Sequence, residues 1–522
     1  MSERSNKYIL VFVFFAAILS LFSTGHFGGD GLANYLTAKS MIEDHDLVIF
    51  DKPFGVTQMR YHTPYETNRG TQGREGKYYS SYGMGMPILL IPFVFMGKIV
   101  SSFISGMDSE YIMQFFASFA NPIAYSFIAL LLFIIVKRLG YNDIISFLIS
   151  IITIFCTINV IYSRTGFTEP ALMLCLVLSA YFLLLHIRNS SWIYMFLSSM
   201  CFSYAFFIKK YYFIYVVCYL IYSFIYCRGK RKTDLLATVV AFAIPVILFI
   251  AAILFFNYIR FGGLLKTEYG TISEVLHRAS TGKRYIKGVY YYLFSSGKGY
   301  LFFNASLLLA LFTIKDFMKK NKLFGTFILS VVLVTLSFWV FKFSRGSLFS
   351  WGTRYILITT PFMGIFLAEF LHQAKDKFRR ASIIVIAFLG FIVQLPCLFV
   401  NSSRWLLFVK EKLAQQEFLI NFVPDLSPIK GCWALFISML HRIFLGESLT
   451  YVYNPDYAHV QSIEASLSGY DILDVWWAHV INLHQDLRIF VIASVLLILS
   501  LIAFLLFRIN LWLKKCSLEQ DL

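Results

Sequence analysis

The feature that most constrains this chain is a series of apolar runs long enough to cross a lipid bilayer, which takes roughly 17–25 residues. Soluble chains carry about a quarter charged residues, whereas this one is 14% charged and 58% hydrophobic over its 522 residues. We therefore expect an all-α polytopic membrane protein with about twelve transmembrane helices. The runs lie near 8–22, 112–136, 144–161, 170–187, 192–208, 211–227, 235–258, 301–318, 323–341, 355–371, 382–400 and 489–512.

The net charge of +17 is concentrated in short clusters between these runs. Such clusters are typical of cytoplasmic loops, so we expect membrane lipid and no nucleic acid as a partner. The stretch 87–105 is ambiguous. If it spans the membrane, the cluster at Lys137 and three later basic clusters fall outside. If it lies on the outer surface as a juxtamembrane helix, all four fall inside. We therefore place it outside, with both termini of this plasma-membrane protein in the cytoplasm.

Four longer segments then face the extracytoplasmic side, and we expect the active site there because long loops usually carry function. They are 24–111, 259–300, 342–354 and 401–488. We predict a transmembrane catalytic module over 1–400, an outer region over 401–488 with an interfacial helix at Cys432–Leu445, and a last transmembrane helix with a tail over 489–522.

Two acidic residues are candidate catalytic groups. Asp30 follows two glycines just after the first apolar run, and Glu169 begins the run that starts at Pro170. Each has a structural alternative, because Asp favours helix N-caps and Glu favours the first helical turn. At the lipid–water boundary, however, a partly desolvated Asp30 is a better general base towards a hydroxyl. Glu169 would orient the acceptor or, with Asp30, hold a divalent metal.

Several cations at the predicted outer face could bind a phosphate, the interpretation that we favour for Lys209 and Lys210; contact with lipid headgroups is the structural alternative. Arginine offers a planar fork for phosphate oxygens. Tyrosine rings suit sugar contact, so Tyr82 is a further candidate. The candidate cations are Lys209, Lys210, Lys298, Arg164, Arg345 and Arg354.

Motifs for nucleotide or hydrolase chemistry are missing from the sequence. It contains no GxxxxGK[ST], GxSxG or HExxH motif, and no CxxC pair or Cys/His cluster with zinc spacing. Most cysteines lie inside apolar runs and are expected to pack as small apolar residues. No cofactor is therefore certain, although a divalent metal stays open.

Short motifs spread along the chain resemble those of the GT-C superfamily of integral-membrane glycosyltransferases, which includes protein O-mannosyltransferases and aminoarabinose transferases. Leu293–Tyr300 and Trp351–Tyr355 look like the SPxKG and WGxRY stretches of bacterial members. The other stretches are Gly29-Asp30, Tyr78–Gly83, Arg164 with Glu169, Asp425–Pro428 and Asp474–Trp477.

The resemblance implies a polyprenyl-phosphate-linked sugar as donor, a glycan, lipid or protein as acceptor, and an inverting displacement at the anomeric carbon. Asp30 would be the general base, and Glu169 would assist it. Lys209, Lys210, Lys298 and Arg354 would bind the donor phosphate. Eukaryotic members carry a paired Asp-Glu where this chain has a lone Asp30, so the resemblance leaves metal dependence open.

Two other classes fit the composition. A transporter or lipid flippase would usually show repeated halves and charged or broken helices at the membrane midplane, and we find no repeated halves. An O-antigen ligase or polymerase would instead centre its site on Arg and His of a large outer loop.

Overall fold

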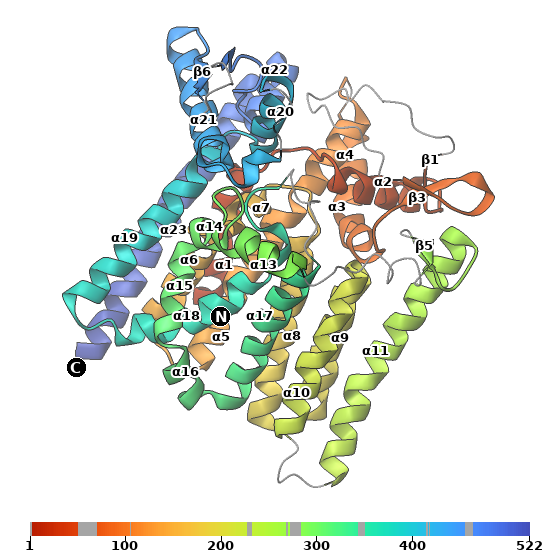
Figure 1. Ribbon diagram of the computed structural model, residues 1–522, viewed down its shortest axis with the longest axis vertical. Helices are drawn as coiled ribbons and strands as arrows, with labels where there is room; N and C mark the ends of the chain where they lie inside the picture. Colours follow the sequence, from red (N-terminus) through yellow and green to blue (C-terminus); the bar gives the residue numbers. More distant parts are fainter. Residues whose placement is uncertain are drawn as a thin grey trace.

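The computed structural model shows a bundle of apolar helices with additional helices and small sheets around one end of it (Figure 1). In Figure 1 the helices α2, α3 and α4 lie at the upper right of the bundle, and α20, α21 and α22 lie at the upper left. The structure describes residues 3–50, 70–104, 106–226, 232–267, 270–271, 283–342, 350–413, 416, 418–454 and 463–521.

Apolar helices make up most of the bundle, as predicted, and the chain is a helical membrane protein. Within the described residues, six helical stretches are long and apolar enough to cross a membrane, by length and composition. They are Ser109–Arg138, Glu169–Asn189, Leu235–Phe261, Lys322–Phe341, Lys377–Leu398 and Gln485–Cys516. Five shorter apolar helices join them: Asn6–Leu21, Gly85–Ser101, Asp143–Phe155, Trp192–Ile208 and Lys210–Tyr226.

The helices of the bundle have these bounds: α1 (Glu3–Leu21), α5 (Ala120–Arg138), α6 (Asp143–Phe155), α7 (Asn159–Ser163), α8 (Glu169–Asn189), α9 (Trp192–Ile208), α10 (Val216–Tyr226), α11 (Lys232–Phe261), α14 (Tyr300–Phe303), α15 (Ala305–Leu308), α16 (Ile314–Lys320), α17 (Lys322–Phe341), α18 (Thr359–Gln373), α19 (Lys377–Gln394) and α23 (Arg488–Asp521). The remaining α-helices are α2 (Asp30–Glu43), α3 (Gly85–Ser101), α4 (Ser109–Ser118), α13 (Lys283–Val289), α20 (Ser402–Lys412), α21 (Pro428–Leu445) and α22 (Trp476–Leu483).

Short strands and tight helical turns occupy the connections. Strands β1 (Val48–Phe50), β3 (Tyr78–Ser80) and β2 (Gly70–Gln72) form an antiparallel sheet in that order. Two hairpins pair β4 (Lys266–Thr267) with β5 (Gly270–Thr271) and β6 (Thr450–Tyr453) with β7 (Ile463–Ser466). The turns are η1 (Arg74–Gly76), η2 (Lys210–Tyr215), the π-helical η3 (Tyr290–Phe294), η4 (Leu309–Phe312), η5 (Arg354–Ile356), η6 (Leu395–Leu398), η7 (Leu419–Asn421), η8 (Pro424–Leu426) and η9 (Gln485–Leu487).

Contacts at the helix ends agree with the predicted alternation of sides. At one end Asp143, which begins α6, pairs with Lys7 of α1 (3.2 Å) and with Lys137 at the end of α5. Cys516 of α23 lies beside the same carboxylate. At the other end Asn121, which lies in the first turn of α5, donates hydrogen bonds to the segment between α7 and α8. Which end faces the cytoplasm stays a prediction.

The stretch predicted as a surface helix, 87–105, corresponds to α3, which packs against α2 and α4. The contact with α4 is close: a Cβ at Gly97 would lie 2.6 Å from the Cα atom of Met113. The predicted interfacial patch Cys432–Leu445 lies within α21, which begins slightly earlier at Pro428.

Some predicted spans are not single regular helices: 144–161 is divided into α6 and α7, and 301–318 departs further. Residues 301–318 form short pieces, α14, α15, η4 and α16, because the backbone leaves helical geometry at Asn304 and Thr313. The side chain of Asn304 accepts a hydrogen bond from the backbone N–H of Ile158 (3.3 Å), so the break is held by a contact with the α6–α7 connection.

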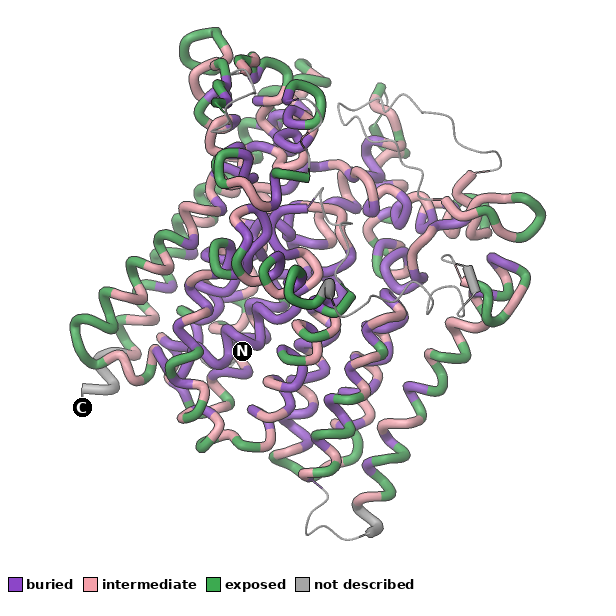
Figure 2. The backbone as a smooth tube through the Cα atoms, viewed as in Figure 1, coloured by how far each residue is buried: buried purple, intermediate pink, exposed green. Residues whose placement is uncertain are grey.

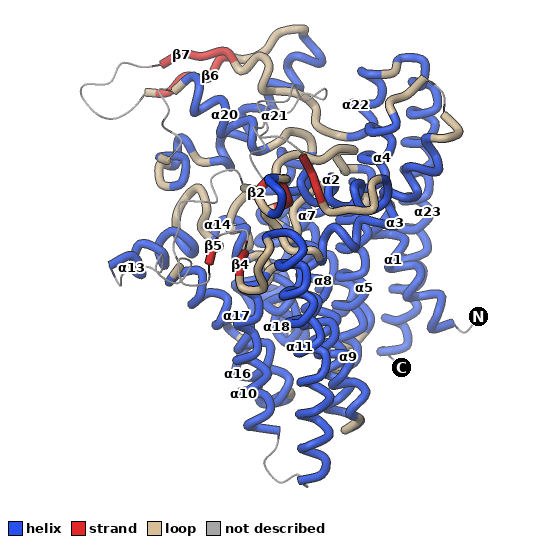
Figure 3. Tube along the Cα trace, turned by 90° about the vertical axis from the view of Figure 1, so that its right-hand side faces the viewer, coloured by secondary structure: helices blue, strands red, loops and turns tan. Residues whose placement is uncertain are grey.

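Burial is concentrated in the centre of the bundle (Figure 2). There α5, α8 and α18 are mostly buried. By contrast, α11 and α23 expose most of their apolar side chains, as expected of helices that face lipid. Figure 3 shows α11 running alongside the bundle down to its lower end.

Candidate functional site

A contact between two glycines brings the two predicted acidic residues together. A Cβ at Gly31 would lie 2.7 Å from the Cα atom of Gly166, and a Cβ at Gly166 would lie 2.8 Å from the Cα atom of Gly31. No other residue type allows two backbones to approach so closely. The start of α2, where Asp30 lies, is thereby held against the segment that leads into Glu169 at the start of α8.

Four charged side chains form what we call the acid–base cluster: Asp30, Glu169, Lys209 and Arg354. The guanidinium of Arg354 lies between the two acids, with Nη2 bound to Asp30 and Nε 2.8 Å from Oε1 of Glu169. Lys209 Nζ lies 2.5 Å from the same Oε1. All four are almost entirely buried, with side-chain exposures of 6%, 0%, 7% and 11% in the order named.

Arg354 is fixed by the turn that precedes it. Trp351 is buried and donates from Nε1 to Gln394 (2.6 Å), and its carbonyl accepts from Tyr162 (2.8 Å). The guanidinium stacks 3.8 Å from the centre of the Phe167 ring, a favourable cation–π position. Burial alone lowers the pKa of Arg354. The carboxylates of Asp30 and Glu169 outweigh this effect and raise the pKa well above its ordinary value. Arg354 therefore remains charged.

Lys209 enters the cluster because α9 ends there and the backbone becomes extended. The end of α9 is covered by the tyrosine- and glycine-rich stretch of the first outer segment. A Cβ at Gly83 would lie 2.5 Å from the carbonyl oxygen of Ile208, and Gly85 is packed just as closely. Tyr82 directly precedes Gly83, which contacts the end of α9, the helix that leads into Lys209. The carbonyl oxygen of Tyr82 accepts a hydrogen bond from Arg260 (2.9 Å).

Lys298 is a fifth cation close to the cluster. It is fully buried, and its ammonium donates to the carbonyl oxygen of Ser350 and to Oγ of Ser350 (3.2 Å). Burial, followed by the charge of Arg354, lowers the pKa of Lys298 to about 7. Its turn is held by the last outer segment, because Gly297 packs against the backbone of Ile420 and its N–H donates to the carbonyl oxygen of Asn421 (3.1 Å).

Buried polar atoms without a partner surround the cluster. Among the described residues, Oε2 of Glu169 accepts no hydrogen bond, and the hydroxyls of the adjacent Thr168 and of Thr353 and Tyr212 also have no partner. Buried polar groups are normally satisfied, so these atoms fit a polar ligand. Thr168, Thr353 and Tyr212 were not among the predicted site residues. Thr168 directly precedes Glu169, and Thr353 directly precedes Arg354.

The arrangement fits a divalent metal poorly at the position first considered. One oxygen of each acid, Oδ2 of Asp30 and Oε1 of Glu169, binds Arg354, so a guanidinium already supplies the positive charge between them. A metal there would have to displace or repel this cation.

The other predicted cations lie elsewhere. Arg164 is buried and points to the carbonyl oxygens of Cys397 and Asp474 and to the carboxylate of Asp474 (3.3 Å). Lys210 donates to Asn257 of α11 (3.0 Å), away from Glu169. Arg345 lies outside the described residues. The structure thus brings together Asp30, Glu169, Lys209 and Arg354 with Lys298 nearby.

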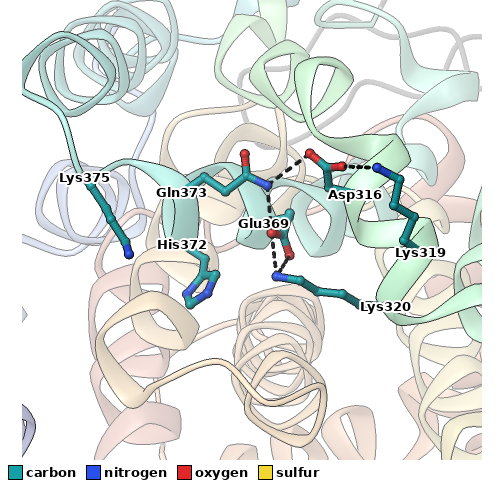
Figure 4. A pocket seen from close by; sticks show the side chains of 7 residues that line it. All are labelled: Asp316, Lys319, Lys320, Glu369, His372, Gln373 and Lys375. Atoms are coloured by element: carbon teal, nitrogen blue, oxygen red, sulfur yellow. Dashed lines mark hydrogen bonds and ion pairs between the residues drawn. The ribbon is translucent and has the colours of Figure 1, made fainter.

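A pocket at the opposite end of the bundle is a competing location (Figure 4). Its acids are paired within it: Lys320 binds both oxygens of Glu369 (2.7 and 2.9 Å), and Lys319 binds Asp316 (3.0 Å). We favour the acid–base cluster as the reaction site because it contains the unsatisfied buried atoms and the predicted motifs. The pocket is lined by Asp316, Lys319, Lys320, Glu369, His372, Gln373 and Lys375.

Comparison with known proteins gives a likeness in structure alone. No protein-family model and no curated protein matches the chain. Among solved structures, the chain is similar to ArnT from Cupriavidus metallidurans, crystallised bound to undecaprenyl phosphate and in the apo state. The bound form has a TM-score of 0.44 and 10% identity, over 84% of this chain and 79% of that chain. The apo form has 0.46 and 11%, over 85% and 72%. Similarity this distant identifies neither the donor nor the acceptor of this chain.

Proposed function

We propose that this protein is a membrane glycosyltransferase that moves a sugar from a polyprenyl-phosphate donor to an acceptor at the outer face. The observation that carries the proposal is the buried acid–base cluster, in which two carboxylates and two cations meet at one end of an apolar bundle. A lipid carrier can keep its chain among apolar side chains while its phosphate reaches these cations.

The cations suit the leaving group of such a transfer. Negative charge grows on the lipid phosphate as the bond to the sugar breaks, so fixed positive groups stabilise the transition state more than the ground state. Arg354 and Lys209 are buried, where their charges act most strongly. Lys298 is also buried, and because its pKa is about 7 it adds a positive charge only in its protonated form. Of these, Arg354 offers the planar fork that matches phosphate oxygens.

The acids suit activation of the acceptor. In the structure the carboxylate of Asp30 is paired with Arg354. A donor phosphate that binds Arg354 would draw the guanidinium away and leave Asp30 to take the proton of the acceptor hydroxyl. Glu169 would hold Arg354 and Lys209 in place and use its unpaired Oε2 to orient the acceptor. We propose that the sugar inverts its anomeric configuration in this single displacement.

The experiment that tests the proposal is lipid binding by the purified full-length protein. We expect undecaprenyl phosphate to bind in preference to the uncharged polyprenol, and Arg354→Ala to lose this preference. Lys319→Met, which removes a lysine that is 77% exposed at the opposite end, is the matched control and should bind like the unchanged protein. Equal binding of the phosphate and the alcohol, or equal loss in both variants, would contradict the proposal.

A further inference from the structure

A second group of ionisable side chains lies close to the acid–base cluster and has no part in the proposed transfer. His26, Asp474 and His479 each present one ligand atom, and these atoms all lie within 4.8 Å of one another. Asp474 is buried and the histidines are partly buried, so an ion could enter from solvent. The group joins opposite ends of the chain, namely the segment that leaves α1 and the residues around the start of α22.

His26 is held in the orientation of a metal ligand. Its Nδ1 lies 3.1 Å from the carbonyl oxygen of Thr24. A carbonyl oxygen can only accept, so Nδ1 carries the proton and Nε2 keeps a free lone pair. Histidines that bind metals are commonly fixed in this way, with the second ring nitrogen donating to a backbone carbonyl.

Asp474 is fixed from several directions. Its backbone N–H donates to Phe399 (2.7 Å), and Arg164 binds both its carbonyl and its Oδ2 atom (3.3 Å from the latter). The other oxygen, Oδ1, lies 3.1 Å from Nε2 of His479. Arg164 therefore orients the carboxylate and leaves Oδ1 directed at His479. The positive charge of Arg164 weakens the binding of a cation at this carboxylate.

From this geometry we infer that His26, Asp474 and His479 bind one divalent transition-metal ion of the zinc class. Two imidazoles and one carboxylate are a usual set of three protein ligands, with water in the fourth position. The ion takes the place of the proton that His479 shares with Oδ1 of Asp474; in a neutral imidazole this proton moves to Nδ1, so that Nε2 offers its lone pair to the metal. Bonds of about 2.0–2.2 Å place tetrahedral ligands roughly 3.4 Å apart, so the side chains need to close by little more than 1 Å.

The ion would link the last outer segment to the residues that follow α1. Two hydrogen bonds already connect these parts: the backbone N–H of Trp476 donates to the carbonyl oxygen of Ser23 (2.8 Å), and its indole N–H donates to that of Ser20 (3.1 Å). Because Asp30 follows His26 by only four residues, the metal would stabilise the segment that carries the proposed base without contacting the reacting groups.

Metal binding by the full-length protein, stripped with a chelator and titrated with Zn²⁺ or Co²⁺, tests this inference without any assay of transfer. We expect about one ion to bind per chain. Bound Co²⁺ should show the visible absorption spectrum of an ion with a low coordination number. His26→Ala should weaken binding at least ~100-fold, the upper end of what even an outer-shell change costs. His441→Ala, whose ring Nδ1 lies near the carbonyl of Glu447, should bind like the unchanged protein.

A conservative variant separates a metal site from a simple hydrogen bond. In His479→Gln the amide can still donate to Asp474, so the metal-free melting temperature should stay close to that of the unchanged protein. Zn²⁺ should raise the melting temperature of the unchanged protein and fail to raise that of His479→Gln. Equal Zn²⁺ binding by the unchanged protein and by His479→Gln, or no saturable binding by the unchanged protein, would overturn the inference.

Discussion

The acid–base cluster and the pocket at the opposite end contain the same kinds of residues but satisfy them differently. In the pocket both oxygens of Glu369 are bonded, to Lys320, Tyr141 and Gln373. In the cluster one oxygen of Glu169 is unpaired among the described residues, and the cations around it are buried.

We propose that the pocket is an ion-pair network that holds helices together, whereas the cluster is arranged to bind a ligand. The pocket's lysines reach water, since Lys319 is 77% and Lys320 51% exposed. Exposed pairs contribute little energy, whereas the cluster's charges are desolvated and act strongly on one another. The comparison therefore predicts large functional effects at one end and small structural effects at the other.

The largest effect is expected for Asp30→Asn, which removes the proposed base. Sugar transfer in membranes that contain the natural acceptor should fall about 10²–10⁴-fold, the usual contribution of general base catalysis. Asp316→Asn, at the opposite pocket, is the control and should leave transfer unchanged. Mass spectrometry of the glycan product measures both, and unchanged transfer in Asp30→Asn would remove Asp30 as the base.

A second comparison concerns stability. Glu169→Gln leaves Lys209 and Arg354 buried with one counter-charge fewer and should destabilise the protein by about 3–5 kcal/mol. Glu369→Gln should cost only about 1–3 kcal/mol, because Lys320 can turn to water and the hydrogen bonds from Tyr141 and Gln373 can persist. Thermal unfolding in detergent measures the difference. Equal losses would show that the two acids have the same structural role.

A third prediction addresses the glycine contact. In Gly31→Ala the new methyl group meets the backbone of Gly166 and pushes the two acid-bearing segments apart. Stability should fall by about 1–3 kcal/mol, and transfer should fall about 10²-fold, as expected for a misplacement of about 1 Å. Gly263→Ala is the control, because its Cβ would meet only the Lys266 side chain at 3.5 Å. The prediction fails if both variants transfer sugar equally well.

The smallest effect concerns pH. Unfolded lysine keeps its proton up to its ordinary pKa, whereas burial lowers the pKa of Lys298 in the folded state to about 7. Between these values the unfolded chain binds more protons, so this residue makes stability rise with pH above about 7. Its contribution is at most about 1.4 kcal/mol per pH unit. Melting temperatures from pH 7 to 10 should rise less in Lys298→Met than in the unchanged protein or Lys319→Met, and parallel curves would contradict the assignment.

Much of the architecture follows from the sequence. The length of the apolar runs indicates which helices contact lipid, and the basic clusters indicate on which side of the membrane each connection lies. These signals predicted the helical membrane fold and placed Lys7 and Lys137 on the same side, where both pair with Asp143. The surface position of α3 stays a prediction. The break of the predicted span 301–318 was not foreseen, because hydropathy does not detect the polar contact that holds Asn304.

The partners within the site could not be derived in the same way. The position of Asp30 and Glu169 at helix starts suggested function, but only the folded chain shows that Arg354 lies between them. Arg164 was expected at the substrate and instead orients Asp474. The cluster of His26, Asp474 and His479 could not be predicted from the sequence, because its residues come from opposite ends of the chain and do not form a recognisable metal-binding motif.

The most direct test of the central claim is mass spectrometry of lipids that co-purify with the protein. The account predicts a polyprenyl-phosphate-linked sugar in the unchanged protein and in Lys319→Met, its loss in Arg354→Ala, and its retention in Asp30→Asn, where the donor binds but does not react. A lipid-linked sugar that stays bound in Arg354→Ala, or that is absent from the unchanged protein while transfer continues, would contradict it.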